Sequence, residues 1–103
     1  MTIKAKTKMI SDGNVQVKML IKHPMETGQR KDRKTGKPIP AHFVEVVTCH
    51  WQDKEMVRAH WGPAISKNPY LSFKISGPQA GETLILRWSD NQGKSGEHLS
   101  EIG

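Results

Sequence analysis

Hydrophobic and polar residues alternate with a period of two along most of this chain. Residues 3–9 place lysine at every second position between less polar residues, and residues 15–21 alternate in the same way. The sequence Ser-Asp-Gly-Asn at 11–14 lies between them and supplies residues that accept the positive φ angles of a tight turn. This pattern predicts a β-hairpin formed by 3–9 and 15–21.

Further alternating segments occur at 43–50, 55–61, 70–75, 83–88 and 95–101. In the segment 43–50, one side of the predicted strand is more apolar than the other. This side carries Phe43, Val47, Cys49 and the following Trp51, with Glu45 as its one polar exception. In 55–61, the alternation places Val57, Ala59 and Trp61 inward and Met56, Arg58 and His60 outward. The last segment is weakly patterned, so we expect an edge strand there.

No window shows the 3.6-residue period of an amphipathic helix. Seven short strands with one apolar face each need a second layer to cover those faces, so we expect an all-β fold. The predicted architecture is an immunoglobulin-like antiparallel β-sandwich of about seven strands, formed by one domain over residues 1–103. Cys49 is the only cysteine, which excludes the intramolecular disulfide of antibody domains.

Two segments interrupt the alternation. Residues 22–42 have no period and are punctuated by proline and glycine, which predicts a long loop or a crossover between strands. Much of the net charge of +6 lies here, since 22–37 holds six basic residues and only two acidic ones. The second segment, 61–70, is stiffened by two prolines and bracketed by Trp61 and Tyr70, which suits either a docking loop or a packed connection. We predict partner binding through these two segments, at Gly62, Pro63, Ser66, Lys67, Asn68, Pro69, Arg30 and Lys31.

The residues that could carry chemistry show no catalytic or ligand spacing. The histidines stand singly at positions 23, 42, 50, 60 and 98, and scattered histidines more often lie on surfaces than bind metal. Cys49 takes the inward phase of its strand, where a thiol is inert. We therefore expect no catalytic residue, no cofactor and no metal, and hence no enzyme. The alternative is a histidine-rich, metal-binding redox protein on a β-sandwich, which metal analysis would distinguish.

The charge also allows a polyanion as the partner. The segment 22–37 contains no aromatic residue for base stacking, so we expect no nucleic acid. No apolar run is long enough to cross a membrane, and the N-terminal residues lack the apolar stretch of a signal peptide. Membrane binding is therefore not expected either.

Three irregular strings, HPMETGQRKD at 23–32, GKPIPAHF at 36–43 and WGPAISKNPYLSFK at 61–74, resemble the Z subunit (SoxZ) of the SoxYZ sulfur-oxidation carrier complex. The similarity extends over nearly the full chain. It implies an immunoglobulin-like domain that forms a heterodimer with SoxY, whose C-terminal cysteine carries the intermediates of thiosulfate oxidation, and through SoxY contact with other Sox enzymes. It also implies a periplasmic location, reached by export with a signal-bearing partner.

Overall fold

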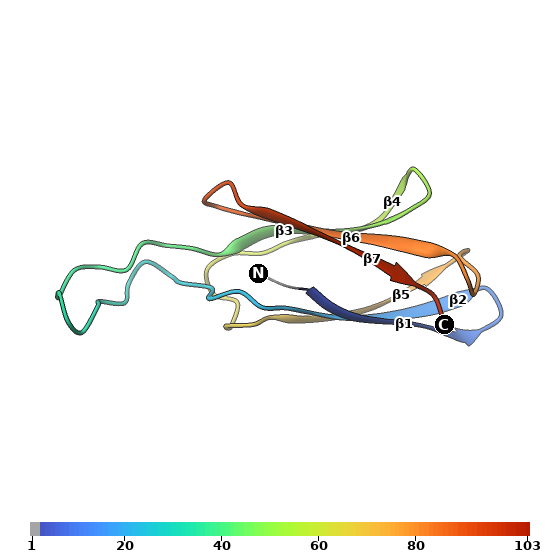
Figure 1. Ribbon diagram of the computed structural model, residues 1–103, viewed down its shortest axis with the longest axis horizontal. Helices are drawn as coiled ribbons and strands as arrows, with labels where there is room; N and C mark the ends of the chain where they lie inside the picture. The colour runs from blue at the N-terminus through green and yellow to red at the C-terminus, as the bar shows by residue number, and fades with distance from the viewer. Residues whose placement is uncertain (1–2) are drawn as a thin grey trace.

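Seven strands form two antiparallel sheets in the computed structural model, which describes residues 3–103 (Figure 1). The three-stranded sheet has the order β1 (Ile3–Ser11), β2 (Asn14–Ile21) and β5 (Tyr70–Ser76). The four-stranded sheet has the order β4 (Lys54–His60), β3 (Val44–Trp51), β6 (Thr83–Asp90) and β7 (Ser95–Glu101). The prediction of an all-β sandwich is confirmed, and β7 is the edge strand that its weak pattern indicated.

The core lies between the sheets because each strand directs alternate side chains inward. Val15 and Val17 of β2 and Leu84 and Leu86 of β6 are fully buried there. Cys49 is 1% exposed, which confirms its inward position. Burying these side chains contributes on the order of 2 kcal/mol each, and this is the main force that holds the two sheets together.

The alternation predicted for β3 misses one buried residue at the start of the strand. Phe43 packs against the core as expected, with Glu45 as the polar exception. The ladder with β6 shifts its register between Val44 and Val46, so Val44 is fully buried and Glu45 is exposed. A β-bulge of this kind places an extra residue on one strand and reverses the phase that follows.

A second bulge changes β4. Cys49 lies opposite Val57 while the next residue of β3 lies opposite Glu55, which leaves Met56 as the extra residue. Met56 and Val57 therefore both pack against the core, although the sequence pattern placed Met56 outward. Trp61 also packs against the core, in agreement with its predicted inward phase.

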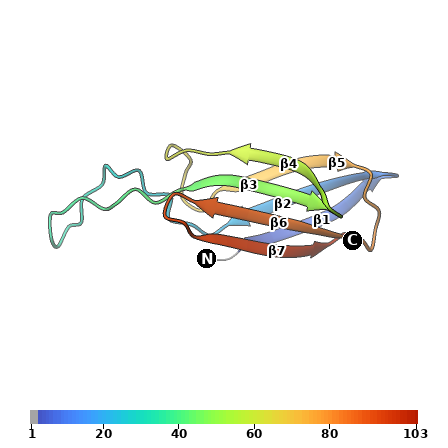
Figure 2. The same cartoon turned by 90° about the horizontal axis from the view of Figure 1, so that it is seen from above.

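The connections that join the two sheets lie at the ends of the sandwich. Residues 22–42 lead from β2 to β3 and extend away from the sheets, which lengthens the molecule to 54 Å against 22 and 18 Å in the other directions (Figures 1 and 2). At the other end, the N–H of Met9 donates to the carbonyl of Gly103, so the C-terminal residue pairs with β1. Residues 3–103 contain no helix long and apolar enough to span a membrane.

Candidate functional site

Residues 22–42, here called the arm, form an irregular two-stranded projection. Near its base, Glu26 and His42 exchange two backbone hydrogen bonds, and further out Ile39 donates to the carbonyl of Arg30. Of the two predicted forms, a long loop or a crossover between strands, the structure shows a crossover from β2 to β3 whose two halves pair with each other. This pairing satisfies backbone groups that an unstructured loop would leave to water.

The tip of the arm presents its basic side chains to solvent. The Asp32 carboxylate accepts hydrogen bonds from the backbone N–H groups of Lys34 and Thr35, which shapes the turn. Arg30 pairs with Glu26, with 2.5 Å between Nη2 and Oε1. Lys31 is exposed and belongs to no ion pair within residues 3–103. The two arm residues predicted to bind a partner therefore differ in charge balance. The Glu26 carboxylate pairs with Arg30, whereas Lys31 has no such pair within residues 3–103.

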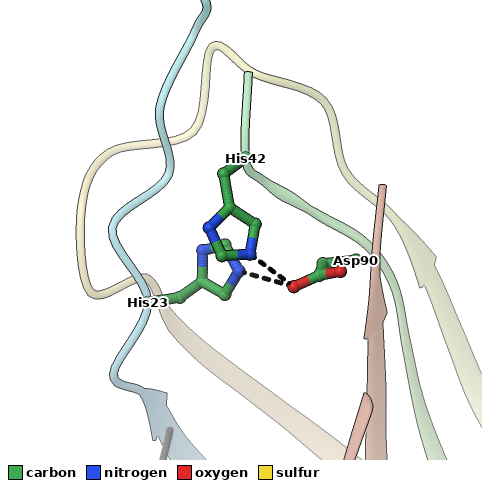
Figure 3. A group of neighbouring side chains, drawn as sticks. All are labelled: His23, His42 and Asp90. Atoms are coloured by element: carbon green, nitrogen blue, oxygen red, sulfur yellow. Dashed lines mark hydrogen bonds and ion pairs between the residues drawn. The ribbon is translucent and has the colours of Figure 1, made fainter. Parts of the chain in front are cut away.

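At the base of the arm, His23, His42 and Asp90 meet in what we call the His–Asp cluster (Figure 3). Asp90 Oδ2 lies 3.2 Å from His23 Nε2 and 2.7 Å from His42 Nε2. His23 comes from the chain leaving β2, His42 from the chain entering β3, and Asp90 from the end of β6. The cluster therefore joins both halves of the arm to the four-stranded sheet.

Both oxygens of the Asp90 carboxylate accept hydrogen bonds. Its Oδ1 accepts hydrogen bonds from the backbone N–H groups of Gln92 and Lys94, at 2.9 Å each. Burial by itself raises the pKa of this carboxyl, but the hydrogen bonds from Lys94, His23, His42 and Gln92 together hold it at about 2. Asp90 is therefore ionised in the folded protein at neutral pH.

His23 is 2% exposed, so the expectation that the histidines lie on the surface is wrong for this residue. Burial is the main cause that lowers its pKa, which the hydrogen bond to Asp90 only partly offsets. The backbone N–H of Met25 donates to His23 Nδ1 over 3.1 Å. Since Nδ1 accepts this bond, the proton of the neutral ring lies on Nε2 and is donated to Asp90.

This tautomer bears on the metal-binding alternative. The three side chains each offer one ligand atom, all within 4.8 Å of one another. A histidine that binds metal through one nitrogen donates the N–H of its other nitrogen to an acceptor. In His23 the other nitrogen faces the N–H of Met25, a donor, so metal ligation by Nε2 would set two donors against each other. The geometry fits a hydrogen-bonded junction and does not fit a metal centre.

The loop of residues 62–69 lies against the base of the arm. Asn68 exchanges two hydrogen bonds with the backbone of His23, through its own N–H and through Oδ1. It also has a positive φ of 53°, which an asparagine tolerates better than most residues. The hydrogen bond from Arg30 lowers the pKa of Glu26, and the charge of the exposed Lys67 adds to this effect. The structure thus brings the two predicted binding segments to one end of the sandwich.

The predicted residues of this loop differ in what they can offer to a partner. Pro63, Ser66 and Lys67 are exposed, and Gly62 is half-buried. Pro69 is buried in this chain, so its contact with a partner stays a prediction. The side-chain oxygen of Asn68 is occupied by His23, so a substitution there would disturb the loop as well as any interface.

Sequence reasoning missed the His–Asp cluster. Its members are separated by 67 and 48 positions along the chain, so no local motif could reveal them. One signal was present: the two histidines stand at the two ends of the aperiodic segment 22–42. Residues that bracket a long projection are natural places for the contacts that hold its base.

The remaining candidate for chemistry, Cys49, is enclosed by the core. Burial raises the pKa of its thiol to about 11. A thiol in this state is neither an accessible nucleophile nor a ready metal ligand.

Comparison with known proteins agrees with these observations. No curated protein matches the chain significantly. The family model described as "Sulphur oxidation protein SoxZ" matches residues 3–100, which include both sheets, the arm and the His–Asp cluster. A match of this length shows the family, and the chain therefore belongs to the SoxZ family, with a role in sulfur oxidation.

Proposed function

We propose that this chain is the non-catalytic subunit of a SoxYZ carrier complex, which binds and supports SoxY. In this proposal SoxY carries the sulfur intermediates of thiosulfate oxidation on its own C-terminal cysteine. The observation that carries the proposal is the state of Cys49. A chain of a sulfur-oxidation family whose only cysteine is buried, with a thiol pKa of about 11, needs a partner to supply the reactive sulfur.

The test is co-expression of this chain with SoxY from the same organism. We expect the two chains to purify together in a one-to-one ratio and to support thiosulfate-dependent turnover with the other Sox proteins. Either chain alone is expected to be inactive. Turnover that is unchanged when this chain is left out would refute the proposal.

The proposal also includes the place of action. The complex would work in the periplasm, and this chain would be exported bound to a partner that carries the signal peptide. Fractionation of cells that express the chain with and without SoxY tests this point. Periplasmic recovery that does not depend on SoxY would contradict it.

Substituting Cys49 by serine is expected to leave turnover of the assembled complex unchanged. The hydroxyl would sit poorly paired among apolar side chains, so the free energy of unfolding should fall by about 1–3 kcal/mol. Chemical denaturation measures the second effect and the turnover assay the first. Loss of turnover in a folded Cys49→Ser complex would mean that the thiol takes part in the chemistry.

The interface with SoxY is proposed to include the arm and the loop of residues 62–69. Both lie at the same end of the sandwich and present exposed basic side chains, among them Lys31 and Lys67. Exposed charges attract an acidic partner over distances of about 10 Å at moderate salt. The arm therefore suits a role in guiding association.

Neutralising Lys31 and Lys34 together with glutamine is expected to slow association with SoxY about threefold to tenfold at low salt, and to change dissociation little. The matched control is Lys54→Gln with Lys94→Gln, which removes the same charge from the start of β4 and from the connection between β6 and β7. Stopped-flow or surface-based kinetics at two salt concentrations would separate the rates. If the dissociation rate carries the effect, the two arm residues make buried contacts in the complex.

A further inference from the structure

The outward face of the three-stranded sheet is covered with lysine. Because side chains of a strand alternate between faces, the lysines of β1 all point away from the core. Five exposed lysines of β1, β2 and β5 share this surface, which we call the lysine face: Lys4, Lys6, Lys8, Lys18 and Lys74. The sandwich therefore carries a second basic surface, separate from the tip of the arm.

The strand register places these charges close together. Lys6 of β1 lies directly opposite Lys18 of β2, and Lys8 and Lys74 lie on either side of Gln16. Like charges directly opposite each other in a sheet are destabilising. The fold bears this cost although a carboxylate at position 6 or 18 would remove it.

The other sheet is built differently. On its outward face, Arg58 pairs with Glu55 and Arg87 pairs with Glu97, each with 2.7 Å between nitrogen and oxygen. None of the strand residues on the lysine face is acidic, and none of its lysines forms an ion pair within residues 3–103. The outward face of the four-stranded sheet thus pairs its arginines with carboxylates, whereas the lysines of the lysine face have no such partners within residues 3–103.

The lysine face also has an apolar depression. A shallow hollow of about 250 Å³ lies among Lys4, Lys6 and Lys18, with Leu20 and Tyr70 in its lining. Tyr70 is 59% exposed, which is the second-highest exposed fraction among the large hydrophobic residues of 3–103. An apolar hollow ringed by charge can receive one anchoring side chain of a protein partner.

We infer that the lysine face docks the acidic surface of a second protein, which associates transiently with the carrier complex. Permanent interfaces are depleted in lysine, because its long side chain is costly to order and its ammonium group to dehydrate. Unpaired lysines suit rapid, salt-sensitive encounters instead. The inference rests on the proposed function, because a carrier complex has to meet the proteins that load and unload it.

The chemistry of the face favours a protein over other polyanions. A surface that binds single-stranded nucleic acid offers several aromatic platforms along a groove, whereas this open face has one aromatic residue, Tyr70. Membrane-surface elements project a continuous apolar side into the lipid. Here Leu20 lines the hollow together with Lys4 and Lys18, so charged residues interrupt the apolar surface.

The test compares Lys18→Glu with Lys54→Glu, which makes the same change of charge on the four-stranded sheet. Binding of the full-length chain to poly-L-glutamate is measured by titration at low and moderate salt, with amide chemical shifts to locate the contact. A DNA duplex and vesicles of phosphatidylglycerol are titrated in parallel. We expect Lys18→Glu to weaken polyglutamate binding about fivefold and Lys54→Glu less than about twofold, with a gap that closes as salt rises.

Thermal stability provides a second measurement. The carboxylate that Lys18→Glu introduces would face Lys6, so this variant should raise Tm by about 3 °C while it weakens binding. Equal loss of polyglutamate binding in both variants would overturn the inference. Face-dependent binding of DNA or vesicles in place of polyglutamate would do the same.

The two proposals can fail separately. The titration needs no partner, so it decides the lysine face even if the chain does not purify with SoxY. If the complex does form, repeating the titration on it tests transient docking. Polyglutamate binding that SoxY blocks would show that the face is the permanent interface, and would overturn docking of a second protein.

Discussion

Substituting Asp90 by alanine is expected to lower the free energy of unfolding by about 3–5 kcal/mol. The Asp90 carboxylate accepts four hydrogen bonds, two from histidines of the arm and two from the turn that follows β6. Its removal leaves the Nε2–H of His23 buried without an acceptor. Chemical denaturation followed by far-UV circular dichroism measures the loss.

Two further variants test whether the His–Asp cluster is the cause of this loss of stability. Asp90→Asn keeps the shape and one acceptor oxygen, but its NH2 group faces donors in either orientation, the Nε2–H groups of the two histidines or the backbone N–H groups of Gln92 and Lys94. Because Met25 holds the tautomer of the His23 ring, we expect Asp90→Asn to remain destabilised by about 2 kcal/mol. Asp53→Ala removes an exposed carboxylate from the turn after β3 and should change stability by less than about 0.5 kcal/mol. Equal stability of the Asp90→Ala and wild-type proteins would show that the His–Asp cluster contributes nothing to the fold.

Acid should weaken the same junction in two steps. The pKa of His23 is lower in the folded chain than its usual 6.5, so only the unfolded chain takes up a proton just below pH 6.5. Stability therefore begins to fall as the pH drops through this value. The pKa of Asp90 is about 2 against 3.8, so a further loss of about 2 kcal/mol follows below pH 3.8. Denaturation curves from pH 7.5 to pH 2.5 should show both steps, and in Asp90→Ala the second should shrink.

Substituting Gly96 by alanine is expected to cost about 3 kcal/mol. Gly96 of β7 lies opposite Trp88 of β6, and a Cβ atom built on it would stand 2.3 Å from the indole Nε1 and 2.7 Å from Cε2. Trp88 is 3% exposed and its ring packs edge-on against His23, so it has little room to move. A thermal melt would report the destabilisation.

A partner substitution tests whether the clash with Trp88 is responsible. Trp88→Phe removes the nitrogen atom nearest to the new methyl group, and Nε1 has no hydrogen-bond partner within residues 3–103 that would be lost. The double variant with Gly96→Ala should therefore be more stable than the sum of the two single effects predicts. Gly62→Ala is the control, because a Cβ there meets nothing within 4 Å. Additive effects of the two substitutions would place the cost elsewhere.

The strands and their faces followed from the sequence, since alternation with a period of two is a local property. Cys49 and Trp61 are inward as their positions predict, and the Asp-Gly turn after β1 joins the strands that the pattern paired. The same pattern put lysine on alternate positions of β1. It could not show that Lys18 of β2 stands directly opposite Lys6, because that depends on the register of the hairpin.

Only the tertiary structure decided the features that depend on distant contacts. The bulges that bury Val44 and turn Met56 inward arise from the pairing of β3 with its neighbours, and a single strand carries no record of them. The His–Asp cluster joins the two ends of the arm to the end of β6, so it exists only once both sheets have formed. Away from the bulges, sequence alone therefore determined which strand residues are inside, Cys49 with its inert thiol among them. The folded chain decided where the arm is held and how charge is distributed over the two faces, because both depend on which strands become neighbours.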